Sequence, residues 1–173
     1  MGALVDMLRD RFADRILDAH DRLGDETVVI GRESMLEIFR WLRDDPEAAF
    51  NLLVDETAVD SLGKTPRFDL VTHLFSLSRG CRLRVKVPID EQDAWSHSLV
   101  PLWKNANWLE REIYDMFGIR FEGHPDLRRI LLYPQFEGHP LRKDYPVSKR
   151  QPIIPERDPI ENPWPPRRVR GEG

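Results

Sequence analysis

Apolar positions in the first part of the chain recur with two different periods, and each period predicts a different element. Between residues 3 and 22 they return every three or four residues, which predicts an amphipathic helix that stops at Gly24. Residues 27–30 form a short run of β-branched residues, as expected of a strand. A second helix is expected to begin with Ser34 as its N-cap and to end before Pro46, because its apolar residues follow the helical period.

The middle of the chain follows the period of β-strands. Residues 49–59 are expected to form one strand, and residues 67–87 alternate between apolar and polar positions as a hairpin that turns at Arg79-Gly80. Cys81 begins an alternating apolar set, so it is expected to be a small buried residue in a strand that Pro88 ends. This order of elements predicts an α+β fold, a small mixed β-sheet with helices packed on one face.

The last third of the chain changes character at a glycine. Residues 93–117 return to the helical period, and Gly118 is the expected C′ residue of that helix. Eight of the 14 prolines then lie between residues 140 and 166, where neither helix nor sheet can be sustained. We therefore expect an α+β domain over residues 1–118 and an extended, proline-rich C-terminal arm over residues 119–173 that is disordered or lies on another protein.

Composition limits the class of protein. The chain has 173 residues, of which 40% are hydrophobic and 32% charged, enough apolar residues for the core of one soluble domain. No run approaches the roughly 18 apolar residues of a membrane span, and the N-terminus does not read as a secretory signal. The single cysteine excludes an internal disulfide and suits the reducing cytoplasm.

Charge is distributed unevenly along the chain. Residues 142–173 contain eight Lys/Arg and five Asp/Glu, a net charge of +3, so the other residues carry −7 of the whole-chain −4. A weakly basic tail on an acidic body suits a protein partner better than a phosphate backbone. We therefore expect no nucleic acid partner.

A five-residue sequence, FEGHP, occurs twice, at residues 121–125 and 136–140. Its histidines, His124 and His139, raise the possibility of a metal site, with further ligands from Cys81, Asp126 or Asp144. Structural zinc sites present ligands in close pairs, whereas these histidines are 15 residues apart. A rigid Gly-His-Pro turn in which the imidazole makes a local or interface hydrogen bond is the preferred interpretation.

The charged helical residues Glu110, Glu112 and Asp115 are candidates for acid–base chemistry. At helical spacing they are more typical of a solvated, salt-bridged surface. The sequence contains no nucleotide-binding glycine loop and no nucleophile elbow, and one cysteine cannot hold an iron–sulfur cluster alone. No active site is expected on this chain.

Two long motifs narrow the interpretation further. Residues 108–131 read WLEREIYDMFGIRFEGHPDLRRIL, and residues 136–146 read FEGHPLRKDYP. This pair of blocks resembles the C subunit of the proton-translocating NADH:quinone oxidoreductase, which is the 30 kDa subunit family of respiratory complex I. The helix–strand order of residues 1–90 agrees with the α+β domain of that family.

The resemblance implies a subunit without catalysis of its own. FMN, iron–sulfur clusters and quinone are then expected on partner subunits, and none on this chain. The chain would lie in the hydrophilic arm, at the cytoplasmic face of the bacterial membrane, packed on the D subunit homologue that helps to form the quinone pocket. Membrane contact would occur only through the complex. The residues expected to form the partner interface or to fix the arm are Glu110, Arg111, Glu112, Asp115, His124, Arg128, Arg129, His139, Arg142, Asp144 and Tyr145.

The motifs leave the electron donor open. Related subunits in membrane-bound hydrogenases and in ferredoxin-type complexes carry the same motif, so the resemblance implies either NADH or another donor for the complex. A His-based metalloprotein is the remaining, less favoured hypothesis.

Overall fold

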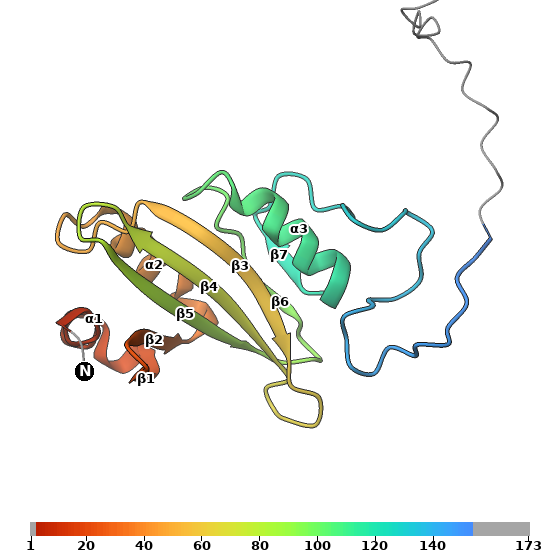
Figure 1. The fold of residues 1–173 in the computed structure, drawn as a ribbon, viewed down its shortest axis with the longest axis horizontal. Helices are drawn as coiled ribbons and strands as arrows, with labels where there is room; N and C mark the ends of the chain where they lie inside the picture. The colour runs from red at the N-terminus through yellow and green to blue at the C-terminus, as the bar shows by residue number, and fades with distance from the viewer. Residues whose placement is uncertain (1–2, 154–173) are drawn as a thin grey trace, which may run out of the picture.

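The computed structural model describes residues 3–153 and has an α+β architecture, as predicted (Figure 1). A five-stranded mixed sheet has the order β1-β2-β5-β4-β3, and a two-stranded sheet pairs β6 with β7. In chain order the helices and strands are α1 (Ala3–Phe12), β1 (Ile16–Arg22), β2 (Asp25–Ile30), α2 (Met35–Asp44), β3 (Leu52–Asp60), β4 (Phe68–Ser76), β5 (Cys81–Ile89), β6 (Trp95–His97), α3 (Ala106–Phe117) and β7 (Arg120–Glu122).

One face of the large sheet carries the core. Alternate residues of β4 and β5 are buried, as the period of two predicts, and they join side chains from all three α-helices in a single apolar cluster. The helices therefore pack on one face. Within this five-stranded sheet, neighbouring strands run antiparallel except β2 and β5, whose parallel pairing makes the sheet mixed.

The expected single helix over residues 3–22 is wrong. The helix ends at Phe12, and Ile16–Arg22 forms β1, which pairs antiparallel with β2. Leu23 and Gly24 both have positive φ, 59° and 83°, which is the backbone of a two-residue hairpin turn with the twist that strands favour. Gly24 is therefore a turn residue, and pairing with β2 outweighs the helical period of Ile16 and its neighbours.

Smaller corrections concern element ends. Ser34 makes no side-chain cap bond, because it lies in helical conformation at the end of a short 3-10 turn before α2. The predicted hairpin is confirmed, with Ser76 opposite Cys81, but Cys81 begins β5 and is only half-buried. Pro88 does not end the strand. It lies beyond the part of β5 that pairs with β2, so its missing N–H removes no ladder bond on that side.

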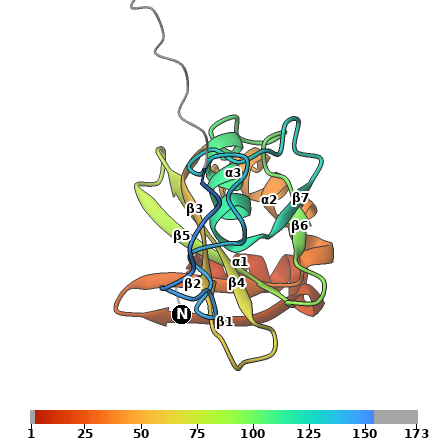
Figure 2. The same ribbon diagram turned by 90° about the vertical axis from the view of Figure 1, so that its right-hand side faces the viewer.

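The predicted helix over residues 93–117 is only half correct. Trp95–His97 forms β6 in parallel with β7, and the helix α3 begins at Ala106. Gly118 closes α3 in the left-handed conformation with φ 81°, as predicted for a C′ residue. Beyond β7 the chain runs to residue 153 without further helix or strand, and Figure 2 brings this segment to the front beside α3. The prolines from residue 155 onward lie outside the described residues.

No helix within residues 3–153 has the length and apolar content required to cross a bilayer.

Candidate functional site

Most of the predicted site residues lie on α3 or next to it, but two of the carboxylates of this helix are not at the surface. Glu110 and Asp115 are completely buried, whereas Glu112 is exposed. The interpretation of all three as a solvated face is therefore wrong. A signal was present for Glu110, because it precedes the buried Ile113 and Phe117 by three and seven residues on the same stripe.

Asp115 holds the segment that follows β7. One carboxylate oxygen accepts a hydrogen bond from Arg129 Nη1 at 2.7 Å, and the other accepts the backbone N–H groups of Ile130, Leu131 and Leu132 at 3.1, 2.9 and 2.9 Å. Burial raises the pKa of Asp115, but the N–H donors and the Arg129 guanidinium outweigh it and hold the pKa below its usual value. The charge of Asp115 is thus bound by the chain's own arm.

Arg111 holds the same segment from another position on the helix surface. Its guanidinium donates to the backbone oxygens of Arg128 at 3.0 Å and Arg129 at 3.1 Å. The Arg128 side chain itself is 73% exposed and pairs with Asp126. Arg111 and Asp115 together therefore bind opposite chemical groups, C=O and N–H, of one backbone stretch.

Both FEGHP histidines bind protein groups. His124 accepts the backbone N–H of Asp126 at 3.0 Å through Nδ1, which leaves Nε2 to donate to the Asn107 oxygen at 3.0 Å. His139 places Nδ1 3.0 Å from the backbone oxygen of Asp115. Within residues 3–153, no group of three His, Cys, Asp or Glu side chains is placed to hold a metal ion. The rigid-turn interpretation fits this geometry.

A second charged cluster fixes residues 142–144 of the arm to the domain. Arg67, 3% exposed, pairs with Asp60 at 2.8 Å and with Asp144 at 2.7 Å. Arg142 pairs with Asp144 and with Glu91, and the Asp60 carboxylate also accepts the backbone N–H of Lys143 at 2.7 Å. Hydrogen bonding from Arg67 lowers the pKa of Asp144, and Arg142 lowers it further. This cluster joins the β3–β4 loop to the second FEGHP block.

Tyr145 packs against other residues of the arm. Its ring stacks on Phe136 with centroids 6.1 Å apart and an interplanar angle of 20°, and Gly138 fits beneath it because a Cβ there would lie 2.9 Å from the ring. The sequence identified the residues of this arm but missed Arg67, Asp60 and their role. A lone arginine before a strand carries no signal for a partner 77 residues away.

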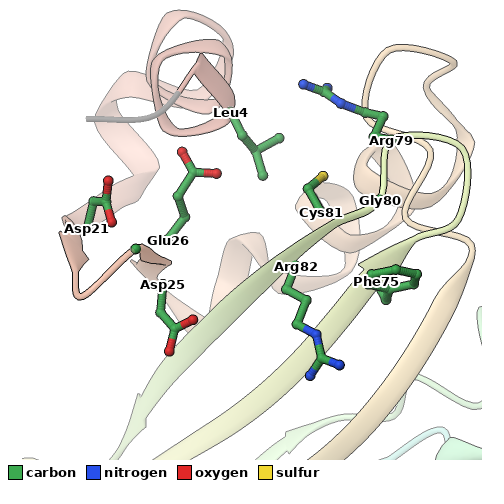
Figure 3. Close-up of a pocket in the computed structure, with 10 residues that line it drawn as sticks. Leu4, Asp21, Asp25, Glu26, Phe75, Arg79, Gly80, Cys81 and Arg82 are labelled. Carbon is green, nitrogen blue, oxygen red and sulfur yellow. The ribbon is translucent and has the colours of Figure 1, made fainter.

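The surface has one hollow at the start of α3, which Pro125 of the arm also lines, and another at the β1–β2 hairpin. One, of about 660 Å³, is lined mainly from the start of α3 and includes Val54, Val100 and Trp108, whose side chain is 71% exposed. The other, of about 560 Å³, has acidic residues of the β1–β2 hairpin on one side and Arg79 and Arg82 on the other (Figure 3). The first is more apolar than polar and suits contact with another protein, whereas the second is a charged surface depression.

Comparison with known proteins agrees with these motifs. The sequence profile of the family described as respiratory-chain NADH dehydrogenase, 30 Kd subunit, matches residues 28–151. The C subunit of the NADH-quinone oxidoreductase of Citrifermentans bemidjiense is 47% identical over 154 residues, which span 89% of this chain and 91% of that protein. The corresponding protein of Brucella ovis is 45% identical over 148 residues, spanning 86% of this chain and 73% of that protein.

Solved structures give the same result for the fold. A trypsin-resistant fragment of Nqo5 is 36% identical with a TM-score of 0.64, and the match covers 72% of this chain and 98% of the fragment. A chain of the membrane-bound sulfane sulfur reductase, an archaeal respiratory membrane complex, has a TM-score of 0.68. That match covers 84% of this chain and 85% of the other, and at 24% identity it concerns the fold alone.

Proposed function

Because the chain belongs to the respiratory-chain NADH dehydrogenase 30 kDa subunit family, we propose that it is a non-catalytic structural subunit of the hydrophilic arm of a complex-I-like assembly. In this role it packs on the D subunit homologue at the cytoplasmic face of the membrane and supports electron transfer from NADH to quinone coupled to proton translocation. FMN, iron–sulfur clusters and quinone belong to partner subunits in this proposal. The names of the relatives favour NADH over a ferredoxin-type donor.

The observation that carries this proposal is that the charged residues of the motif are hydrogen-bonded within the chain itself. Asp115 and Arg111 of α3 are bound to the chain's own arm, the first through Arg129, and His139 of the arm is bound to the backbone of α3. Groups already held in charge-assisted hydrogen bonds are poorly suited to proton transfer with a substrate. They are well suited to keeping a loop without helix or strand in one shape, as a docking surface requires.

Apolar side chains on this surface supply the contact area that a partner needs. Trp108 on α3 is 71% exposed, and Leu131 and Leu141 of the arm are 61% and 52% exposed. Large exposed aromatic residues beside a hollow are the usual anchors of protein interfaces. We therefore assign contact with the D subunit homologue to the exposed side of α3 and the adjoining arm.

Exchanging Trp108 tests this assignment. The full chain carrying Trp108→Ser, co-expressed with the tagged D subunit homologue, should bind at least about 30-fold more weakly, since an anchoring tryptophan contributes about 2 kcal/mol or more. Leu77→Ser is the matched control, because Leu77 is 65% exposed but lies in the β4–β5 loop. Equal affinities of wild type and Trp108→Ser would contradict the assignment.

A further inference from the structure

Two carboxyl groups lie together in the core between the large sheet and α3. Glu56 of β3 is 2% exposed and Glu110 of α3 is 0% exposed. Glu56 lies opposite Thr72 of β4 in the sheet, and that residue is also completely buried. Neither carboxyl belongs to the arm-fixing clusters described above.

Most oxygens of this pair lack a hydrogen-bond partner among the described residues. One oxygen of Glu110 accepts the backbone N–H of Leu99 at 2.6 Å. The other Glu110 oxygen, both oxygens of Glu56 and the hydroxyl of Thr72 are buried without one. An ionised carboxylate in such surroundings has an energetic cost that protonation removes.

The charges around the pair offer no compensation. Glu110 on α3 and Asp55 on β3 both act on Glu56, and each disfavours its ionised form. The Thr72 hydroxyl of β4 lies near enough to favour the ionised form, but it makes no hydrogen bond of good geometry and does not outweigh burial. Around Glu110 the Ser98 hydroxyl and the backbone N–H groups of the 98–100 segment favour the ionised form, but less than burial disfavours it. Among these described neighbours none is basic. Burial above all, and then the charge of Glu110, raises the pKa of Glu56 well above its usual value, and burial raises the pKa of Glu110 to about 7.

We propose that Glu56 and Glu110 form a buried proton-binding site that holds at least one proton at neutral pH. The ligand is the proton itself, and Glu56, with no partner for either oxygen among the described residues, is the carboxyl that retains it. Two adjacent carboxyls in a low-dielectric site cannot both ionise without strong repulsion, so they titrate as a coupled pair.

A hydrogen bond joins Glu110 to the backbone segment that lines the hollow at the start of α3. Leu99 donates to Glu110 and is followed by Val100, which lines the apolar hollow beside Trp108. An ionised Glu110 accepts the Leu99 N–H more strongly than a protonated one does. Uptake of a second proton, on Glu110, therefore loosens the segment that leads into that hollow.

Carboxyl-carbon NMR of the folded full chain, labelled with ¹³C at glutamate Cδ, tests the proposal. One resonance should keep the shift of a protonated acid at pH 7, far above the ordinary glutamate pKa of about 4.3. That resonance should be absent from Glu56→Gln and unchanged in Glu112→Gln, an exposed residue of the same helix as Glu110. The wild-type spectrum is informative by itself, so the test does not depend on the folding of Glu56→Gln.

Two outcomes would overturn the proposal. In one, every glutamate resonance titrates near the ordinary value, which would show that both carboxyls are ionised at neutral pH. In the other, elemental analysis of the dialysed chain finds a stoichiometric cation whose removal shifts the Glu56 and Glu110 resonances. The pair would then be a cation site.

Discussion

The exchange Asp115→Asn removes one charge and barely changes the side-chain volume, which makes it a sharp test of how the arm is held. An asparagine oxygen can keep the three backbone N–H bonds from residues 130–132, but its NH₂ group then faces the Arg129 guanidinium, 2.7 Å from the present oxygen. Turning the amide places the NH₂ group against three N–H donors instead. Either orientation leaves buried donors facing each other.

The magnitude follows from the burial of the pair. Asp115 is 0% exposed and the Arg129 side chain is 19% exposed, so solvent cannot replace the lost interaction fully. Breaking a buried ion pair by removing one partner costs about 3–5 kcal/mol, and we expect Asp115→Asn to lower the free energy of unfolding by that amount. Urea denaturation followed by tryptophan fluorescence measures it.

A second measurement locates the effect. Arg128 and Arg129 are trypsin sites in the released segment, so cleavage there should accelerate in Asp115→Asn relative to cleavage within the sheet. Glu112→Gln on the same helix is the control and should change stability by less than about 0.5 kcal/mol. If Asp115→Asn lowered the free energy of unfolding as little as this control does, and if proteolysis were unchanged, Asp115 would not hold the arm.

Three further perturbations follow from the same structure. Arg67→Ala leaves the buried carboxylate of Asp60 without its guanidinium and should lower the free energy of unfolding by about 3–5 kcal/mol in urea denaturation. Gly118→Ala adds a Cβ at φ 81° and 2.7 Å from the His139 ring, so it should cost more than about 1 kcal/mol by thermal denaturation. Because the pKa of Glu56 is raised on folding, its stabilising contribution is lost as pH rises above about 4.3 towards the folded-state pKa; Glu56→Gln should therefore gain stability over wild type with rising pH, by at most about 1.4 kcal/mol per pH unit.

Each of these has a matched control. Arg128→Ala removes a 73% exposed guanidinium and should cost no more than about 1 kcal/mol; a similar value for Arg67→Ala would refute the buried cluster. Gly63→Ala has φ 85° with no neighbour within 4 Å, so an equal loss there would show that backbone strain alone acts at Gly118. If the difference in stability between Glu56→Gln and wild type did not change with pH, the predicted linkage of folding to proton binding would be wrong.

Local patterns predicted the elements whose causes are local. The β4–β5 hairpin was found because strict alternation and an Arg-Gly turn lie close together in the chain, and Gly118 was recognised because a helix end needs a left-handed residue. The segment Ile16–Arg22 was misread because its helical period competes with pairing to β2, a tertiary interaction. The prediction of helix at Trp95–His97 was wrong for the same reason, since its partner strand β7 follows only after α3.

The candidate site shows the same division. The resemblance of the motifs to the family gave Asp115, Arg129 and His139 the role of interface or arm-fixing residues. Their burial was not predictable, because an aspartate on a helix is normally solvated unless donors arrive from elsewhere. Here those donors come from 14 to 17 residues further along the chain.

By itself, the sequence determined the fold class and the family. These depend on hydrophobic period and on motif identity, which are properties of neighbouring residues. Only the tertiary structure decided that Asp115 and Arg67 bind the chain's own arm and that Glu56 lies with Glu110 in the core. Such pairings join groups distant in sequence, and their energies depend on burial, which exists only once the chain has folded.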